Sequence, residues 1–370
     1  MEIKVKREEL LDNLGWMQSV VDRKTTMPIL SNVLLEAKAN SLTLAATDLQ
    51  VGVIGYCQAE VGTAGKVAVP ARELYNIVRE LPDEIIQLKQ GSNNWVSIQC
   101  GKSKFKLIGR DPSEFPAIPK KGEGEGVFFD SKTITEMLDK VSFAISTDET
   151  RFNLNGVFLE TGSDQGKETL NMVATDGHRL SVIQRPVKKK IGLKKGVIFP
   201  RKGVAELRRL LETEEGEFNV YLGEKQVVVE SGSKTLSMRL IDGQYPPYQQ
   251  VIPKNQGKVV VVLKEELVQS LRRVSVVNQD RTQGVQFSIS PGNLEISSNN
   301  PDVGEAKEEL QATYKGGAFT VGFNARYFLE ALGVIGDEKI VLQLNDNVSP
   351  CLIQSEVDRG FTHVIMPMRI

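Results

Sequence analysis

The stretch from Phe199 to Leu211, FPRKGVAELRRLL, has the pattern of a helix start. Pro200 restricts the chain before the first turn, two basic residues follow, and apolar residues then come at helical spacing. The same kind of opening occurs at Val69-Pro70-Ala71-Arg72 and at Phe323-Asn324-Ala325-Arg326. The three apolar stripes are Val204, Leu207 and Leu211; Leu74, Ile77 and Leu81; and Phe328, Ala331 and Ile335.

A second set of helices shows the same threefold repetition. Each has apolar residues at i, i+4 and i+7, which define one buried stripe: Leu10, Leu14 and Met17; Ile134, Leu138 and Val141; Leu267, Leu271 and Val274. A period this long indicates three copies of a whole domain and not a solenoid. Short stretches with Pro and Gly separate the copies, so we predict domains at residues 1–121, 127–253 and 254–370.

Alternating residues between these helices predict strands, for example at Leu42–Ala45, Val227–Val229 and Leu294–Ile296. Corresponding hairpins recur at Asn32–Glu36, Gly156–Glu160 and Gly284–Phe287. Two helices and many strands per copy predict an α+β fold, in which antiparallel sheets are covered by helices on one side.

Composition limits the class of protein. A chain of 370 residues exceeds what one hydrophobic core supports, and its net charge of −1 excludes a histone-like polycation. Cys57, Cys100 and Cys351 are odd in number and far apart, so neither a disulfide framework nor a zinc site is expected. No run of about 18 apolar residues occurs. We therefore expect a soluble, cytoplasmic protein with reduced thiols.

Basic residues recur seven positions apart on the second helices, which places each pair on one face: Arg72 and Arg79, Arg201 and Arg208, Lys202 and Arg209. The third copy keeps only Arg326, and the first helices add Lys132, Lys140, Arg272 and Arg273. Acidic runs at 212–217, 305–309 and 337–338 are expected in loops. Segregation of this kind favours a polyanionic partner, while the plain alternative is an ordinary solvated helix face.

Catalytic and cofactor motifs are missing from the sequence. His178 and His363 are the only histidines, and a hydrolase that uses His178 with Asp176 lacks a nucleophile at a suitable spacing. Asp176-Gly177 is more simply a tight turn. The sequence has no phosphate-binding glycine loop, dinucleotide fingerprint or metal-ligand cluster, so we expect no cofactor, no metal and no enzymatic activity.

Several motifs resemble the bacterial sliding clamp family, the β subunits of DNA polymerase III. The strongest are Ala174-Thr175-Asp176-Gly177-His178-Arg179-Leu180, Phe199-Pro200-Arg201-Lys202-Gly203-Val204 and the terminus Val364-Ile365-Met366-Pro367-Met368-Arg369-Ile370. Further matches are Met27-Pro28-Ile29-Leu30, Thr47-Asp48-Leu49, Val69-Pro70-Ala71-Arg72 and Arg151 with Leu154-Asn155-Gly156. The resemblance covers the whole chain in order and agrees with the triplication.

The resemblance implies a non-catalytic processivity factor. In this family two subunits join head to tail into a ring, with helices inside and sheets outside, which encircles duplex DNA without reading its sequence. By resemblance, the DNA-facing residues are Lys24, Arg72, Phe152, Arg201, Lys202 and Arg209, and the homodimer interface joins Val276 and Val277 to Phe105 and Leu107 of the next subunit.

The resemblance also implies a pocket for short hydrophobic peptides between the second and third copies, with Arg151 at its rim. Its partners would be the polymerase III catalytic subunit, an ATP-driven clamp loader, other polymerases and repair proteins. The pocket residues are Leu154, Thr175, Gly177, His178, Arg179, Leu180, Pro246, Val251, Asn324, Tyr327, Val348, Pro350, Val364, Met366, Pro367 and Met368.

Three positions depart from the family pattern. Asn153 stands where the family often has an aromatic residue, which bears on the DNA contacts of that loop. Gln250 stands where a basic residue is common and Thr282 where an aromatic residue can occur, so we expect a peptide preference different from that of well-known members. Two alternatives stay open beside the sliding clamp. One is a ring-shaped peptide-binding scaffold with no use for DNA, and the other is the hydrolase that uses His178 and Asp176.

Overall fold

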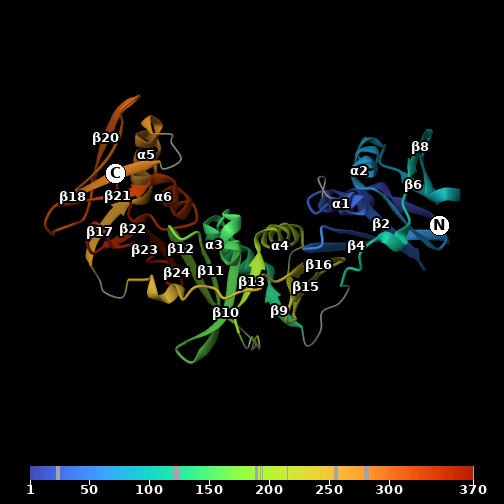
Figure 1. The fold of residues 1–370 in the computed structure, drawn as a ribbon, viewed down its shortest axis with the longest axis horizontal. Helices are drawn as coiled ribbons and strands as arrows, with labels where there is room; N and C mark the ends of the chain where they lie inside the picture. The colour runs from blue at the N-terminus through green and yellow to red at the C-terminus, as the bar shows by residue number, and fades with distance from the viewer. Residues whose placement is uncertain are drawn as a thin grey trace. The chain divides into compact units, whose positions relative to one another are not determined.

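The computed structural model describes residues 1–21, 26–119, 126–187, 191, 193, 195–214, 216–253, 257–278 and 283–369. They form two compact units (Figure 1). Unit 1 consists of Met1–Thr135 and Lys202–Leu240, and unit 2 consists of Glu136–Arg201 and Ile241–Ile370. The second copy of the repeat is therefore divided between the two units.

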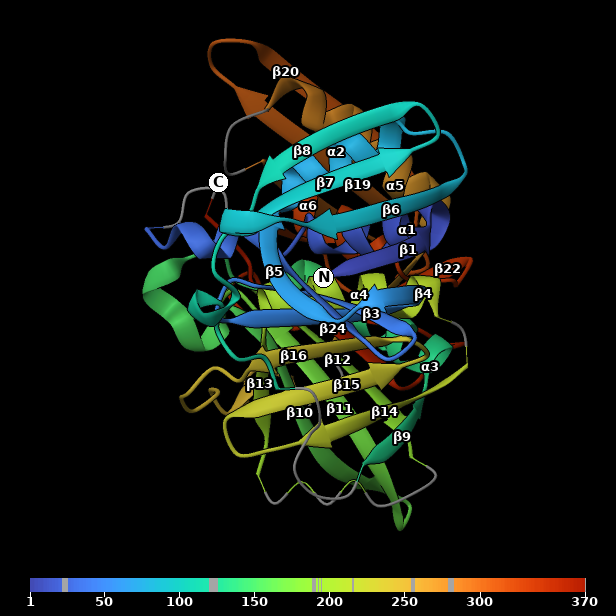
Figure 2. The same ribbon diagram turned by 90° about the vertical axis from the view of Figure 1, so that its right-hand side faces the viewer.

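Unit 1 is built on one antiparallel sheet of 12 strands. Its strands are β1 (Glu2–Lys6), β2 (Asn32–Lys38), β3 (Ser41–Thr47), β4 (Val51–Thr63), β5 (Gly65–Pro70), β6 (Ile85–Gln90), β7 (Trp95–Cys100), β8 (Ser103–Ile108), β9 (Val127–Asp130), β14 (Glu217–Leu222), β15 (Gln226–Ser231) and β16 (Lys234–Arg239). The main path, visible from top to bottom in Figure 2, is β8-β7-β6-β1-β4-β16-β15-β14-β9. Strands β3, β2 and β5 branch from β4 in that order.

The helices of unit 1 bury the predicted stripes with one change. In α1 (Arg7–Met17), which packs against α2 (Ala71–Glu80) and β4, the residues Leu10, Leu14 and Met17 have no exposed surface. In α2, Val78 is fully buried four positions after Leu74, whereas Ile77 is only half-buried. The prediction that Ile77 belongs to the buried stripe was wrong, because the stripe runs through Ala71, Leu74 and Val78 and leaves Ile77 at its edge. Leu81 is buried just after the helix ends at Glu80.

Unit 2 contains an eight-stranded and a four-stranded antiparallel sheet. Their strands are β10 (Gly156–Asp164), β11 (Lys167–Thr175), β12 (Arg179–Pro186), β13 (Val197–Pro200), β17 (Lys258–Leu263), β18 (Gly284–Ser290), β19 (Asn293–Asn300), β20 (Gly304–Gln311), β21 (Phe319–Asn324), β22 (Lys339–Leu344), β23 (Cys351–Gln354) and β24 (Phe361–Ile365). The strand orders are β13-β10-β11-β12-β24-β23-β22-β17 and β20-β19-β18-β21. Every paired strand in both units is antiparallel, as the α+β prediction requires.

The remaining helices are α3 (Ser131–Val141), α4 (Arg201–Thr213), α5 (Lys264–Val274) and α6 (Ala325–Leu332). In unit 2, α5 packs against α6, β19 and β20. Phe328 of α6 packs on Phe287 and Phe323 with ring centroids 5.0 and 5.1 Å apart. Gly333 follows the end of α6, so the predicted stripe residue Ile335 is buried beyond the helix. Within the described ranges, no helix is long and apolar enough to span a membrane.

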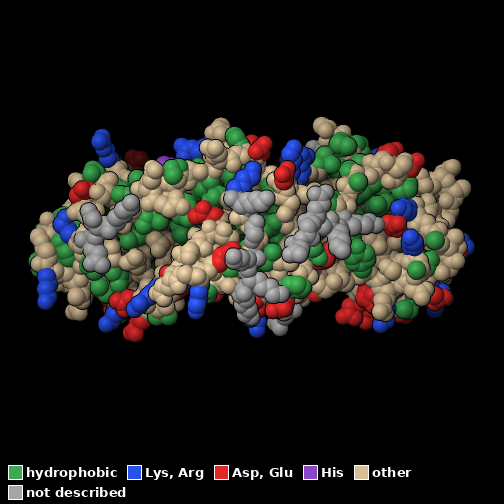
Figure 3. Space-filling view, turned by 90° about the horizontal axis from the view of Figure 1, so that it is seen from below, with side chains coloured by type: hydrophobic (Ala, Val, Ile, Leu, Met, Phe, Trp, Pro, Cys, Tyr) green, Lys and Arg blue, Asp and Glu red, His purple; other side chains and the backbone are tan. Residues whose placement is uncertain are grey.

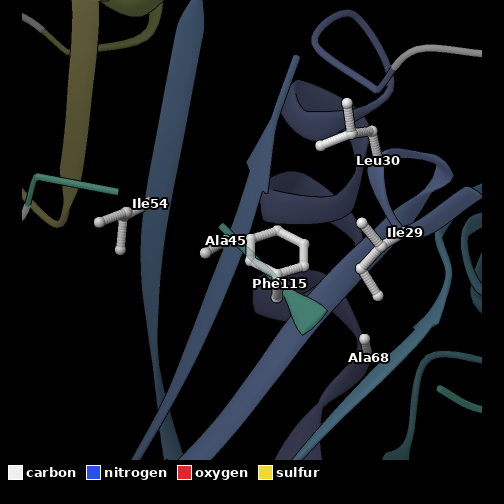
Figure 4. Packing of buried hydrophobic residues seen from close by; sticks show 6 residues of the cluster. All are labelled: Ile29, Leu30, Ala45, Ile54, Ala68 and Phe115. Atoms are coloured by element: carbon white, nitrogen blue, oxygen red, sulfur yellow. The ribbon is translucent and has the colours of Figure 1, made fainter. Parts of the chain in front are cut away.

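Short 3₁₀ helices connect the main elements. They are η1 (Pro28–Ser31), η2 (Ser92–Asn94), η3 (Pro112–Glu114), η4 (Ser142–Ala144), η5 (Glu149–Leu154), η6 (Tyr248–Gln250) and η7 (Ser275–Val277). Figure 4 shows how one of these connections is anchored in unit 1: the ring of Phe115, which follows η3, lies beside Ala45 of β3. Ile29, Leu30, Ile54 and Ala68 complete this cluster, so the chain leaving the first copy is fixed to its core.

The acidic run at 305–309 does not form a loop, contrary to the prediction. It belongs to β20, which is an edge strand of the four-stranded sheet. Glu308 pairs with Arg273 of α5, and Lys307 of β20 pairs with Glu295 of β19. Charged side chains on an edge strand discourage pairing with other chains, so this charged sequence is tolerated as a strand at the edge of the sheet.

Candidate peptide-binding site and nucleic-acid interface

A tight turn joins β11 to β12 in unit 2. The hydroxyl of Thr175 donates to the carbonyl of Arg179 at 2.5 Å and accepts from the N–H of Gly177 at 3.0 Å. The carboxylate of Asp176 accepts from the N–H groups of His178 and Arg179 at 2.9 and 3.0 Å. This confirms the predicted turn. The Asp176 carboxylate is used to bind backbone N–H groups of the turn, so it does not orient His178 as the hydrolase alternative requires.

Arg179 connects this turn to helix α6. Its side chain is buried, and its Nε donates to Asp176 at 3.1 Å. The same guanidinium donates to Glu330 of α6 and to the carbonyl of Phe143, and it lies 4.5 Å from the centroid of the Tyr327 ring. Because these contacts use the donors and the face of the guanidinium, Arg179 connects the turn to α6 and has a structural role.

The C-terminal segment is fastened to this turn and to β21. The N–H of Met366 donates to the carbonyl of His178 at 2.8 Å, and the N–H of Met368 donates to Gly322 at 2.9 Å. In the sheet, Val364 of β24, which precedes this segment, lies opposite Leu180 of β12. Both residues belong to one buried cluster, and the half-buried methionines continue its apolar surface outward.

A third wall comes from the segment that leaves the second copy. Tyr245 stacks on Phe158 with ring centroids 4.7 Å apart, and the Tyr248 hydroxyl donates to Glu160 at 2.6 Å. Burial raises the pKa of both tyrosines, so their hydroxyls stay protonated. Tyr245, Tyr248 and Ile252 pack against the cluster of Leu180 and Val364, and this leaves Pro246 and Val251 exposed between them.

The other predicted pocket residues lie around these three segments. Arg151 is half-exposed and donates to the carbonyl of Asp176 at 3.3 Å. Asn324 caps α6 by accepting from the N–H of Arg326 at 2.9 Å, and Leu154 is buried in η5. Val348 is exposed in the connection between β22 and β23, with Pro350 two residues further on, and its N–H donates only to Asp346 of that connection. His178 is exposed on the turn, and Pro367 is half-buried between the two fastened methionines.

Several residues of this arrangement were not predicted, and Glu330 and Tyr245 are two of them. Glu330 forms an ion pair with Arg179. It also pairs with Arg326 at 2.8 Å, and the spacing of four residues between Arg326 and Glu330 is the sequence feature that could have indicated a role for Glu330. Tyr245 is the other, and its aromatic stacking on Phe158 depends on a long-range contact with no sequence signal. Gln250 is exposed at the end of η6, whereas Thr282 lies outside the described residues.

The predicted DNA-facing residues differ in their surroundings. Arg72, Arg201 and Arg209 are exposed and make no ion pair within the described part of the chain. Lys202 is different, because its ammonium binds Asp48 and the carbonyl of Val20. Lys24 lies outside the described residues.

Several other basic residues of the helices are neutralised by acidic partners. Lys140 of α3 pairs with Glu136 at 2.9 Å and with Asp358, and Arg273 of α5 pairs with Glu308. On the face that Figure 3 shows, basic and acidic side chains are interspersed. Phe152 is exposed on η5, next to Asn153, whose amide donates to the carbonyl of Gln244 at 3.0 Å.

The predicted interface residues lie at exposed apolar places in each unit. Strand β8 pairs only with β7, so it is an edge of the large sheet, and it carries exposed Phe105 and half-buried Leu107. In η7 of unit 2, the side chain of Val276 is 63% exposed beside half-buried Val277.

No group of His, Cys, Asp and Glu residues suited to a metal ion occurs among the residues that the structure describes. The three cysteines are free and buried. Burial raises the pKa of Cys57 to about 12, which keeps this thiol protonated and unreactive.

Comparison with protein families identifies three successive matches. Residues 1–119 match the N-terminal domain of the DNA polymerase III beta subunit, residues 129–247 its central domain and residues 249–369 its C-terminal domain. The curated beta sliding clamps of Caulobacter vibrioides and Escherichia coli are 36% and 31% identical, and the match covers 100% of this chain and of each relative.

Solved structures agree with these matches. The sliding clamp of Caulobacter crescentus has a TM-score of 0.97 and 36% identity, over 100% of this chain and 99% of that one. The Bartonella birtlesii clamp, solved with griselimycin bound, has a TM-score of 0.96 and 36% identity over 100% of both chains. The chain therefore belongs to the DNA polymerase III beta subunit family, the sliding clamps, which are non-catalytic rings that encircle DNA and tether the polymerase for processive replication.

Proposed function

We propose that this protein works in the cytoplasm, at the nucleoid, as a head-to-tail homodimer that slides on duplex DNA. The observation that carries the proposal is the match of all three family domains, in order, along the whole chain. The domains are proposed to be residues 1–121, 127–253 and 254–370. A heterologous contact between β8 of one subunit and η7 of the next closes the ring, and it covers the exposed Phe105 and Val276.

The DNA contacts are proposed to be weak and independent of sequence. Arg72, Arg201 and Arg209 supply exposed guanidinium groups to phosphates, and Lys24 and Phe152 are proposed as further DNA contacts. Lys202 contributes less, because its ammonium is held by Asp48. A sliding ring requires this weakness, since topology retains the protein on DNA and each phosphate contact must be released repeatedly.

The pocket of unit 2 is proposed to bind short hydrophobic peptides of partner proteins. Support comes from the turn Thr175–Arg179, the fastened methionines Met366 and Met368, and the apolar residues Pro246 and Val251, which together present an adaptable apolar surface with exposed polar groups at its rim. The partners are the polymerase III catalytic subunit, other polymerases, repair proteins and the ATP-driven loader that opens the ring.

The test of this function is retention on DNA of defined topology. The protein is loaded by its cognate loader on nicked circular plasmid at moderate salt, and retention is measured by gel filtration before and after linearisation. We expect retention on the circle and loss from the linear product. Equal retention on both forms contradicts sliding and favours ordinary phosphate binding. Absence of retention on both, with peptide binding intact, favours a scaffold that has no use for DNA.

A further inference from the structure

Unit 1 contains a cavity of about 480 Å³ that none of the assigned roles uses. Four segments line it: residues 47 and 49–52, residues 116–119, residues 225–226 and residues 237–239. All four belong to unit 1, so the geometry of the cavity is defined within one compact body. The first two segments come from the first copy of the repeat, and the other two come from the second copy.

The first wall has the same turn as the proposed peptide pocket of unit 2. The hydroxyl of Thr47 donates to the carbonyl of Val51 at 2.8 Å and accepts from the N–H of Leu49 at 3.0 Å. The carboxylate of Asp48 accepts from the N–H groups of Gln50 and Val51 at 2.9 and 2.7 Å. The turn Thr175–Arg179 makes the same four hydrogen bonds. The φ angles at the third position are also alike, 75° at Leu49 and 89° at Gly177.

The strand beside this turn is fastened in the same way. The N–H of Arg239 donates to the carbonyl of Gln50 at 2.9 Å, as the N–H of Met366 donates to that of His178 at 2.8 Å. One residue earlier, Met238 stands opposite Val51 in the sheet, as Ile365 stands opposite Arg179. The repeat therefore builds one pocket frame twice, once at each junction between successive copies.

The third wall is a proline-rich segment anchored by a buried aromatic residue. Phe115 is fixed in the cluster of Figure 4, and half-buried Ile118 packs against the same cluster. This wall is close-packed: a Cβ atom at Gly52 would lie 2.7 Å from Cγ2 of Ile118. The segment from Tyr245 to Ile252 has the same role in unit 2. The frame is thus preformed, as ligand sites usually are.

The chemistry of the cavity differs from that of unit 2 in charge. Arg239 occupies the place of Met366, and Lys225 lies in the hairpin that corresponds to the connection between β22 and β23; both side chains are exposed. None of the described residues that line the cavity is acidic, and the nearby Asp48 carboxylate is occupied by the backbone and Lys202. Leu49, 45% exposed, and Ile118 supply the apolar surface. The ligand must therefore combine an apolar side chain with an anionic group.

We propose that this cavity is a second peptide-docking site, which binds a short segment carrying a bulky apolar side chain next to a carboxylate. The proposal takes the pocket of unit 2 as its pattern. It rests on the contacts within unit 1 and on the charges of Lys225 and Arg239. The test follows binding at the cavity and binding at the proposed pocket of unit 2 through separate signals, so that one can fail without the other.

The test uses the full chain labelled with ¹³C at Ile and Met methyl groups. N-acetyl-leucyl-phenylalanine, which has a free carboxylate, is titrated against its C-terminal amide as the matched probe. Methyl signals of Ile118 and Met238 report the cavity, and those of Met366 and Met368 report the pocket of unit 2. We expect saturable shifts of Ile118 and Met238, with the carboxylate probe binding about two- to five-fold more tightly than the amide, as for an exposed ion pair.

Two variants separate charge from shape. The double variant Lys225→Gln/Arg239→Gln should abolish the preference for the carboxylate while the amide still binds, and Lys225→Arg/Arg239→Lys should keep the preference. Shifts confined to Met366 and Met368 overturn the second site and leave the proposed function intact. Equal binding of the two probes to the unchanged protein overturns the acidic specificity. No shift of Ile118 or Met238 at millimolar probe overturns the proposal as a whole.

Discussion

The guanidinium of Arg179 lies over the ring of Tyr327, 4.5 Å from its centroid, while its Nε binds Asp176 at 3.1 Å. A side chain at the end of β12 thereby joins the turn of the second copy to helix α6 of the third. These contacts of the buried guanidinium fix the turn Thr175–Arg179 against α6.

Replacement of Arg179 by Lys tests this link. Lysine keeps the charge but loses the planar fork that reaches Asp176, Glu330 and the carbonyl of Phe143 together. We expect a loss of stability of about 2–4 kcal/mol, near the range for a broken buried ion pair, and weaker peptide binding. Chemical unfolding and fluorescence anisotropy measure the two effects. The control Arg151→Lys, at a half-exposed side chain, should change stability by less than about 0.5 kcal/mol. Equal effects of the two substitutions would contradict the central position of Arg179.

Gly177→Ala separates backbone strain from side-chain crowding. The residue has a φ of 89°, and an added Cβ atom would lie 2.7 Å from Nη1 of Arg151. Gly166, with a φ of 79°, has no atom within 4 Å of the same position, so Gly166→Ala reports the backbone cost alone. We expect about 1 kcal/mol of destabilisation in both variants, and reduced peptide affinity only for Gly177→Ala, because Arg151 must move. Unchanged peptide affinity in Gly177→Ala would remove Arg151 from the rim of the site.

Arg72→Gln and Arg209→Gln should each weaken attraction to DNA. Each exposed guanidinium that contacts a phosphate contributes about 0.9 to the slope of log K against log salt. We expect each substitution to reduce this slope by about one, as measured by fluorescence titration on duplex DNA between low and moderate salt. Lys4→Gln is the matched control, since Lys4 is an exposed cation of β1 paired with Glu60 at 3.0 Å. A slope that changes as much for Lys4→Gln argues for a general charge effect.

Val276→Asp should dissociate the proposed homodimer. A carboxylate placed in the apolar contact would lose its hydration, and central interface residues contribute about 2 kcal/mol or more, which corresponds to about 30-fold in the dissociation constant. Sedimentation velocity over a dilution series gives this constant. Val303, which is 67% exposed in the turn between β19 and β20, provides Val303→Asp as the control. A dimer that survives Val276→Asp unchanged would exclude η7 from the interface.

His363 makes stability depend on pH. Burial, and then the charge of Arg179, lower the pKa of its ring from 6.5 to about 3. Below pH 6.5 the unfolded chain binds a proton on His363 that the folded chain does not bind. The free energy of unfolding therefore decreases as the pH is lowered, by up to about 1.4 kcal/mol per pH unit, until about pH 3. His363→Leu should remove this dependence from chemical unfolding curves measured between pH 7 and 4.5. His178→Gln, at the exposed histidine, should retain it.

At pH 7 the same His363→Leu substitution should cost little. Both ring nitrogens of His363 are buried without a hydrogen-bond partner within the described structure, so leucine removes two unsatisfied polar atoms. Leucine must still fill the space between the rings of Phe143 and Phe361. A large loss of stability at pH 7, with the pH dependence unchanged, would contradict both the burial and the neutral state of this ring.

Local sequence patterns predicted the parts of the fold that depend on neighbours in the chain. Leu267, Leu271 and Val274 are buried as their spacing indicates, and the turn at Asp176-Gly177 forms as its residue types require. Contacts between distant segments were out of reach of such patterns. The pairing of Lys202 with Asp48 joins residues 154 positions apart, and neither residue type indicates the other as its partner.

The pocket shows the same division between local and distant information. The family resemblance named Arg179 as a pocket residue, but its burial between Asp176 and Glu330 appeared only in the fold. The strand at 304–311 was missed for another reason: its run of glutamates is poor in strand-forming residues, and only its edge position makes the charges favourable.

The repeated segment of the sequence and the compact unit of the fold are different parts of the chain, because the second copy is divided between the two units. Strand β16 of that copy completes its sheet against β4 of the first copy, and β12 completes its own against β24 of the third. A central copy cut out of the chain would therefore expose two unpaired strand edges, one at β16 and one at β12. The sequence period marks the repeated domain, whereas strand pairing across each junction ties the central copy to both of its neighbours.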